Sequence, residues 1–177
     1  SGMSYLMGYR DGPPINSGIM HTDAYSGVLA CGATISALRE RVISGSGQEI
    51  DISQQEASMT LLAEYIMEGS ISGTSPMRQG NSNRDYAPQG CYRAKDSIWV
   101  AISVKTDDHW RSFCRSLGLE DLFAKDDYAT KDSRIRNAIQ LDREISQCIS
   151  KYVSENVVQK LQIALVPCEK ILTLLEA

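Results

Sequence analysis

The stretch that decides the fold is residues 21–47, which read HTDAYSGVLACGATISALRERVISGSG. Its apolar residues recur at spacings of three, four and seven, as the residues on one face of a helix do. These residues are Val28, Leu29, Cys31, Ile35, Leu38 and Val42. The pattern predicts a helix over 23–43 that buries Cys31 as a small hydrophobic residue. The glycines in Ser44-Gly45-Ser46-Gly47 are expected to end it.

Asp23 opens this predicted helix, and its position has two interpretations. As an N-cap, its carboxylate accepts hydrogen bonds from the free amides of the first turn, which contributes about 0.5–2 kcal/mol. As a nucleophile, it benefits from the helix N-terminus, which favours the ionised carboxylate. A carboxylate positioned against an acyl group can gain roughly 7–11 kcal/mol from proximity alone. Spacing by itself leaves both interpretations open.

The segments on either side of this helix carry weaker signals. The chain up to Ser17 has no periodicity and is expected to be extended or looped. Alternation of polar and apolar residues predicts a short strand over 49–52, and an apolar-periodic run predicts a second helix over 55–67 that ends at Gly69. Residues 70–89 are rich in Ser, Gly, Asn and Pro, so they are expected to form a domain junction or an active-site loop.

Beyond this segment the pattern changes to strands. Two strands, over 90–94 and 98–104, are predicted to form a hairpin around Lys95-Asp96-Ser97. Thr106 is expected to cap the helix that follows, and Gly118 is expected to end that helix.

Two more helices are predicted towards the end of the chain. Apolar residues step by three or four between 135 and 152, as in an amphipathic helix. Ser154 is expected to cap the next helix. Pro167 is expected to break it.

Composition excludes several classes of protein. The formal net charge of the 177 residues is -4 and the basic residues are dispersed, so nucleic acid is not an expected partner. No apolar run approaches the about 20 residues that span a bilayer, and no secretory signal is present, so no membrane partner is expected and the cytoplasm is the expected compartment. The five cysteines lie far apart and include no C-x-x-C pair, which argues against disulfides and against a metal site. No Walker-type loop or GxGxxG is present to hold phosphates.

Ordered motifs along the chain resemble those of class III coenzyme A transferases, the CaiB/BaiF family, which also includes formyl-CoA transferases and α-methylacyl-CoA racemases. The motifs of the first half are Gly12-Pro13-Pro14, Gly18, Asp23 with Ser26-Gly27, and Ala37-Leu38-x-x-Arg41-x-x-x-Gly45-x-Gly47-Gln48-x-x-Asp51-x-Ser53. Those of the second half are Gly80-Asn81, Ala87-Pro88, Gly90-x-Tyr92, Asp96, Val100-Ala101-Ile102, Trp110 and Val166-Pro167-Cys168. The resemblance runs in order over nearly the whole chain.

The resemblance implies a chemistry for Asp23. In the family, the aspartate that matches Asp23 attacks an acyl-CoA thioester to give a mixed anhydride. CoA thiolate then attacks this anhydride to form an aspartyl-CoA thioester. An acceptor carboxylate reacts with that thioester and runs the two steps in reverse. The segment Gly80-Asn81 matches a glycine-containing loop near the substrate, whose amides would bind developing oxyanions. The spacing adds His21, two residues before Asp23, because in an extended segment it would share a side with Asp23 and could serve as an acid–base or orienting residue that contacts the substrate. CoA and acyl-CoA are implied as substrates together with a carboxylic acid, with no tightly bound cofactor.

Two alternatives to transfer stay open. The racemases of the family pair the matching aspartate with a histidine upstream and with a glutamate just after the strand that matches 98–104. This chain reads Ser103-Val104-Lys105-Thr106-Asp107-Asp108 there, without a glutamate, so only Asp107 or Asp108 could substitute. The other alternative is a truncated remnant of the family without catalytic activity, which serves in binding or assembly.

The resemblance also implies an architecture. Family chains are about twice as long or more, so this chain is expected to be a central-to-C-terminal piece of mixed α/β (α+β) class. Residues 1–74 would end a Rossmann-like large domain and carry Asp23 on long helices. Residues 75–166 would form a small domain with a hairpin and helices, and 167–177 would start the return to the large domain. Family chains interlock in pairs, so a homo-oligomer, a dimer, is expected.

Overall fold

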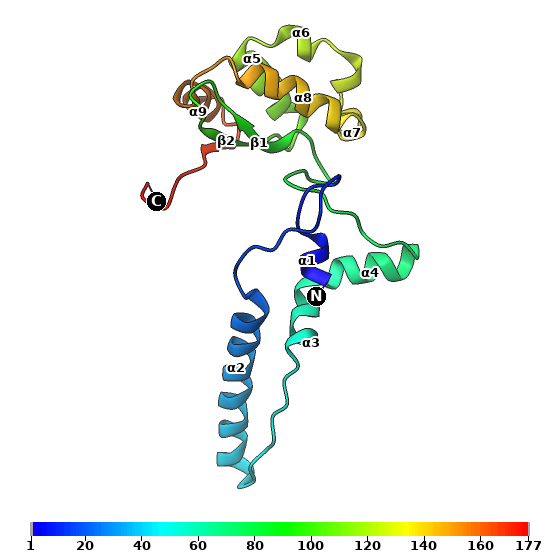
Figure 1. The fold of residues 1–177 in the computed structure, drawn as a ribbon, viewed down its shortest axis with the longest axis vertical. Helices are drawn as coiled ribbons and strands as arrows, with labels where there is room; N and C mark the ends of the chain where they lie inside the picture. Colours follow the sequence, from blue (N-terminus) through cyan, green and yellow to red (C-terminus); the bar gives the residue numbers. More distant parts are fainter. Residues whose placement is uncertain (1, 177) are drawn as a thin grey trace. The chain divides into compact units, whose positions relative to one another are not determined.

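The computed structural model describes residues 2–176. The chain forms two compact units, residues 1–80 and 81–177 (Figure 1). The first unit consists of helices and irregular segments, whereas the second joins helices to a small antiparallel sheet. This mixed architecture is the α+β class that the sequence predicts.

The first unit is organised around one long helix. Helix α2 spans His21–Ser44, and Gly45 ends it in the left-handed conformation with its N–H donating to the carbonyl of Arg41. The chain then runs back to α3 (Gln54–Met59), which packs against α2 (Figure 1). The unit is completed by α1 (Gly2–Leu6), the 3₁₀ turn η1 (Thr60–Leu62) and α4 (Ala63–Ser72).

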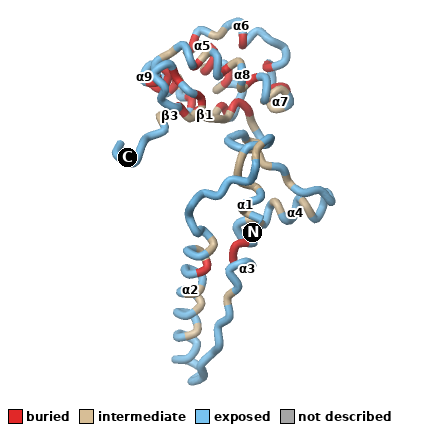
Figure 2. Tube along the Cα trace, in the orientation of Figure 1, coloured by how far each residue is buried: buried red, intermediate tan, exposed pale blue. Residues whose placement is uncertain are grey.

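The apolar face of α2 is exposed in this structure. Val28, Ile35 and Val42 expose 70%, 63% and 86% of their surface, and Figure 2 shows α2 as exposed along nearly its whole length. Cys31 is also exposed, so the prediction that it lies in the core is wrong. The periodicity shows that a face is apolar but does not say what covers it. Within residues 2–176, Ser26 is the one buried residue of α2.

Two other local predictions in this unit are wrong. Residues 49–52 form no strand, because a strand requires a hydrogen-bonded neighbour and no described strand lies in this unit. The helix predicted over 55–67 is divided into α3, η1 and α4, since Leu62 leaves helical geometry at φ -115° and ψ 12°. The last helix runs through Gly69 and ends at Gly73, which is left-handed with φ 68°.

The second unit contains a three-stranded antiparallel sheet in the order β1-β2-β3. Strands β1 (Gln89–Arg93) and β2 (Trp99–Ser103) form the predicted hairpin. Strand β3 (Cys168–Lys170) pairs with β2, and this pairing has no counterpart in the sequence predictions.

Helices cover this sheet and supply most of the core. Thr106 caps α5 (Asp107–Leu117) as predicted, because its hydroxyl accepts from the backbone N–H of His109, and Gly118 ends the helix in the left-handed conformation. The remaining elements are α6 (Glu120–Phe123), η2 (Asp126–Tyr128), α7 (Lys131–Arg136), α8 (Ala138–Ile149) and α9 (Ser154–Ile163). Fully buried residues of the core include Val100, Trp110, Phe113, Leu141, Ile145 and Leu161. Figure 2 shows the buried residues concentrated in this unit.

The cap of α9 comes from the hairpin turn rather than from Ser154. The N-cap position belongs to Val153, and Ser154 is the first helical residue. The Asp96 carboxylate accepts from the Ser154 hydroxyl at 2.7 Å and from its backbone N–H at 3.2 Å. These hydrogen bonds lower the pKa of Asp96. The predicted cap at Ser154 is therefore wrong, because a carboxylate distant in sequence satisfies the helix terminus instead.

Candidate functional site

Asp23 is the third residue of α2, and its carboxylate is exposed. The N-cap position belongs to Met20, whose side chain makes no capping hydrogen bond. The N-cap interpretation of Asp23 is therefore wrong, because a capping residue precedes the first helical residue and the helix already begins at His21. The first turn still places the ionised carboxylate near the positive end of the helix dipole.

One oxygen of the Asp23 carboxylate is held by a neighbouring side chain. The Gln54 side-chain amide donates from Nε2 to Oδ1 of Asp23 at 3.0 Å. Gln54 is the first residue of α3, so the first turns of two helices meet at this contact. Within residues 2–176, the other oxygen, Oδ2, has no hydrogen-bond partner. Gln54 thus holds one oxygen of an exposed residue, and the other oxygen makes no hydrogen bond to the described residues.

Small residues bring the two helices together at this point. Ser26 of α2 and Ala57 and Ser58 of α3 are the buried residues of these helices. Their short side chains allow the two backbones to approach closely. The hydroxyls of Tyr25 and Thr60 lie 3.0 Å apart and form a second link between the α2 segment and the α3–η1 segment. We call this arrangement the α2–α3 junction.

His21 does not share a side with Asp23 in this structure. The expected proximity required an extended segment, but residues 21–23 are helical. Two residues of a helix are separated by about 200° around its axis. The premise of the prediction is therefore wrong, and a role of His21 in substrate binding stays a prediction.

Gly80 has a structural reason to be glycine. Its φ is 60°, and an added Cβ would lie 2.7 Å from Cδ1 of Tyr9. The Gly80 N–H donates to the carbonyl of Gly8 at 3.0 Å, so the amide expected to serve a substrate is engaged within the chain. Asn81 is exposed and begins the second unit. Substrate binding by Gly80 and Asn81 stays a prediction.

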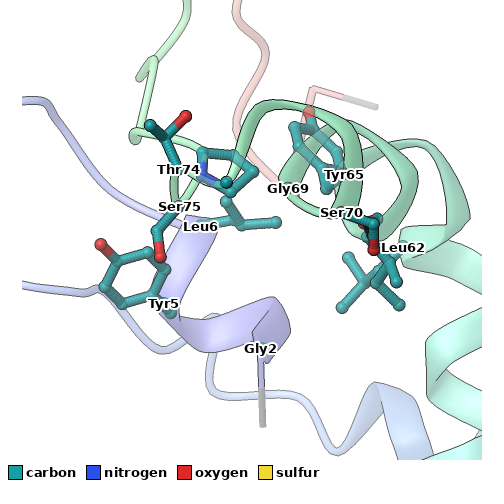
Figure 3. Close-up of a pocket in the computed structure, with 12 residues that line it drawn as sticks. Gly2, Tyr5, Leu6, Leu62, Tyr65, Gly69, Ser70, Thr74 and Ser75 are labelled. Atoms are coloured by element: carbon teal, nitrogen blue, oxygen red, sulfur yellow. Dashed lines mark hydrogen bonds between the residues drawn. The ribbon is translucent and has the colours of Figure 1, made fainter.

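A pocket of about 430 Å³ lies in the first unit, between α1 and α4 (Figure 3). Tyr5, Leu6, Leu62 and Tyr65 contribute to its wall. Neither Asp23 nor any other predicted site residue lines it, and none of the lining residues is charged. Phosphate groups are usually bound by Lys, Arg or exposed backbone amides. This pocket therefore does not match the phosphates of a nucleotide.

Neither a metal-binding cluster among the described residues nor the thiols of Cys114 and Cys168 compete with Asp23 as a site. No group of three or more His, Cys, Asp and Glu among the described residues could hold a metal ion. Burial raises the pKa of Cys114 and of Cys168 to about 12, so neither thiol ionises near neutral pH. Thiolates are the nucleophilic form of cysteine. Among the described helices, none is long and apolar enough to cross a membrane.

The acidic pair after β2 is engaged in ion pairs. Asp107 accepts from the buried guanidinium of Arg134 at 2.8 Å. Asp108 pairs with Arg111, one turn further along α5, at 2.8 Å. Both carboxylates therefore have structural partners at the start of α5.

Gln54 is the functional candidate that the sequence predictions missed. The spacing of α3 marked Gln54 only as a residue at the start of a helix. Its pairing with Asp23, 31 residues earlier, depends on the course of the segment between α2 and α3. The small residues Ser26, Ala57 and Ser58 were the available signal, because small residues on facing helices permit a close approach.

Comparisons with known proteins place the chain among CoA-transferases. A sequence model of the family described as CoA-transferase family III matches residues 1–177. Succinyl-CoA:mesaconate CoA-transferase of Haloarcula hispanica is 32% identical over 161 residues, which cover 91% of this chain and 40% of that protein. Succinate–glutarate CoA-transferase of Agrobacterium fabrum is 29% identical over 146 residues, which cover 82% of this chain and 36% of that protein.

A solved structure has the same fold. The crystal structure of a CAIB/BAIF family protein from Brucella suis matches with a TM-score of 0.88 and 26% sequence identity, over 99% of this chain and 46% of that one. The chain thus spans less than half the length of each of these proteins.

Proposed function

Since this chain belongs to CoA-transferase family III, we propose that it carries the nucleophile of an enzyme that moves coenzyme A between an acyl-CoA and a carboxylic acid. Asp23 is the residue to which we assign this role. The observation that carries the proposal is the position of Asp23, an exposed residue in the first turn of α2 whose Oδ1 accepts a hydrogen bond from Gln54.

The proposed reaction proceeds through covalent intermediates on Asp23. Oδ2 attacks the thioester carbonyl, the C–S bond breaks, and CoA thiolate leaves an aspartyl anhydride. The thiolate then adds to Cγ of Asp23, and the product carboxylate departs to leave an aspartyl-CoA thioester. An acceptor carboxylate reverses both steps, so free aspartate is regenerated. No oxidant and no metal enters this balance.

The substrates are assigned by chemical class. The acyl-CoA donor and the carboxylate acceptor follow from the family, and no tightly bound cofactor is required. The relatives are named for succinyl-CoA or succinate with mesaconate or glutarate. Succinyl-CoA with a small dicarboxylic acid is therefore the first pair to test.

Racemisation is the less favoured alternative. It would need a second acid–base group after β2, where only Asp107 and Asp108 stand. Both carboxylates are paired with arginines, Asp107 with Arg134 and Asp108 with Arg111. In each pair, one carboxylate oxygen is occupied by a guanidinium group instead of being free to meet a substrate. This supports transfer.

We further propose that the chain acts as a homodimer in the cytoplasm. The exposed apolar residues of α2, including Val28, Ile35 and Val42, form a surface that would be stabilised by burial. Both an enzyme and a non-catalytic remnant of the family would associate through such a surface. Transfer of coenzyme A therefore distinguishes them, because only the enzyme would carry it out.

Trapping the intermediate tests the proposal directly. The complete gene product that contains this chain is incubated with succinyl-CoA and hydroxylamine, and peptides are analysed by mass spectrometry. A hydroxamate at Asp23 is expected, and it should be absent after Asp23→Ala. Glu40→Gln, a matched change of an exposed carboxylate further along α2, should leave the label in place. A hydroxamate on a different residue would show that the assignment of the nucleophile is wrong.

A further inference from the structure

Gln54 presents its amide nitrogen to the Asp23 carboxylate for a simple chemical reason. An ionised carboxylate only accepts hydrogen bonds, so the glutamine must turn its NH₂ group, rather than its oxygen, towards Oδ1. The distance of 3.0 Å from Nε2 to Oδ1 is that of an ordinary N–H···O hydrogen bond.

The α2–α3 junction holds this contact without relying on the Gln54 side chain. Ser26, Ala57 and Ser58 are buried there, and the Ser58 hydroxyl donates to the backbone carbonyl of Gln54 at 2.6 Å. The Ser53 side chain caps α3 by accepting from the backbone N–H of Glu56. These contacts fix the backbone at position 54. The side chain there can therefore be changed while the junction remains.

Only some steps of the proposed reaction place negative charge on Oδ1. When Oδ2 attacks the substrate thioester, the oxyanion develops on the substrate's own carbonyl oxygen. When CoA thiolate or the acceptor carboxylate adds to Cγ of Asp23, the oxyanion develops on Oδ1. Oδ2 departs with the product carboxylate, whereas Oδ1 stays bonded to Cγ throughout the cycle.

On the basis of the proposed function, we propose that Gln54 is the oxyanion donor for the steps in which Cγ of Asp23 is attacked. Its N–H is already within hydrogen-bonding distance of the oxygen that becomes charged, so no rearrangement is required as the charge forms. The hydrogen bond strengthens as Oδ1 gains charge, and such a gain in the transition state raises the rate of the step. Gln54 contributes much less to the first attack by Oδ2.

Rapid-quench intact mass spectrometry separates these steps. The complete gene product is mixed with succinyl-CoA, and the enzyme bearing the acyl group is distinguished from the enzyme bearing CoA. Gln54→Leu removes the donor and is expected to slow formation of the CoA adduct by about 10²–10³-fold, the usual loss for one oxyanion donor. Release of CoA thiolate in the first step should stay within a few-fold of wild type. The acyl adduct then accumulates.

Two further variants sharpen the test. Gln54→Met keeps a side chain of similar length without an N–H donor or a charge, and the same selective loss is expected. Gln55→Leu is the matched control, because Gln55 is the exposed neighbouring glutamine on α3 and makes no hydrogen bond to Asp23. Its adducts should form at wild-type rates.

Each outcome separates the inference from the proposed function. If Gln54→Leu and Gln54→Met form the CoA adduct on Asp23 at the wild-type rate, the inference is wrong and the nucleophile stands. If both steps slow equally, Gln54 only positions the carboxylate, and the oxyanion assignment is overturned. If the wild-type protein forms no adduct on Asp23, the proposed function fails and the inference fails with it.

Discussion

Replacing Arg134 by methionine is expected to lower the unfolding free energy of the second unit more than replacing an exposed residue of that unit does. The Arg134 side chain is fully buried, and its guanidinium donates to the carbonyl of Ala87 at 2.9 Å and to the carbonyl of Tyr128 at 3.2 Å. A third bond reaches Asp107 at 2.8 Å, and the guanidinium also lies over the ring of Trp110. One side chain thus satisfies acceptors from three segments of the unit.

The loss of unfolding free energy can be estimated from the hydrogen bonds that methionine cannot make. Met fills a similar volume, so the packing on Trp110 is largely kept. The carbonyls of Ala87 and Tyr128 lose their hydrogen-bond donor, and both residues are almost fully buried. Each buried acceptor without a partner costs about 1–3 kcal/mol. With two such acceptors, the expected loss of unfolding free energy is about 2–6 kcal/mol. Asp107 stays solvated, since 56% of its side chain is exposed.

Urea unfolding followed by tryptophan fluorescence measures this loss. Both tryptophans, Trp99 and Trp110, lie in residues 81–177, so the signal reports this unit. With a urea dependence of about 1–2 kcal/mol per molar, the midpoint should fall by about 1 M or more. Arg136→Met, on the exposed side of the same helix, should change the free energy by less than about 0.5 kcal/mol. Equal midpoints for the two variants would refute the reasoning.

Three further predictions concern the turn at Gly80, the cap of α9 and the exposed face of α2. Gly80→Ala should cost about 1–2 kcal/mol, because φ is positive and Tyr9 lies against the site, and hydrogen exchange of the amide at position 80 should become faster. Asp96→Asn should reduce the stability of the second unit at pH 7. Because the hydrogen bonds from Ser154 lower the folded pKa of Asp96 below 3.8, the wild-type advantage should shrink as the pH falls below that value and vanish below the lowered pKa, which a series of urea midpoints from pH 7 downwards would reveal. Val42→Glu should leave the unfolding free energy within about 0.5 kcal/mol but reduce self-association in sedimentation experiments.

Local signals predicted local structure well. The cap at Thr106, the end at Gly118 and the hairpin of β1 and β2 are all confirmed, because each depends on residues that are neighbours in sequence. The helix predicted over 23–43 is confirmed with small differences at its ends. The signals of Thr106 and Gly118 act over a few positions, so the local sequence was enough to predict them. The terminus of α9 is different, because the distant Asp96 satisfies it.

Burial and pairing between distant segments could not be predicted in the same way. The period of α2 showed an apolar face, yet Cys31 on that helix is exposed. Alternation over 49–52 favoured a strand, yet no neighbouring strand exists there for it to pair with in the described structure. The contact of Gln54 with Asp23 spans 31 residues. Each of these outcomes depends on what lies opposite in space, which periodicity does not contain.

Within residues 2–176, the Asp23 carboxylate accepts one hydrogen bond, from Gln54, and this suits the proposed role of Asp23 as both nucleophile and leaving group. Several charged donors around it would stabilise the free carboxylate, and stabilisation of the ground state slows attack on the thioester. One neutral amide holds Oδ1 with little such cost, and its hydrogen bond becomes stronger only when that oxygen gains charge. The small residues Ser26 and Ala57 supply the positional restraint that additional donors would otherwise provide. The α2–α3 junction therefore separates the positioning of Asp23 from its electrostatic stabilisation, and the proposed chemistry needs this separation.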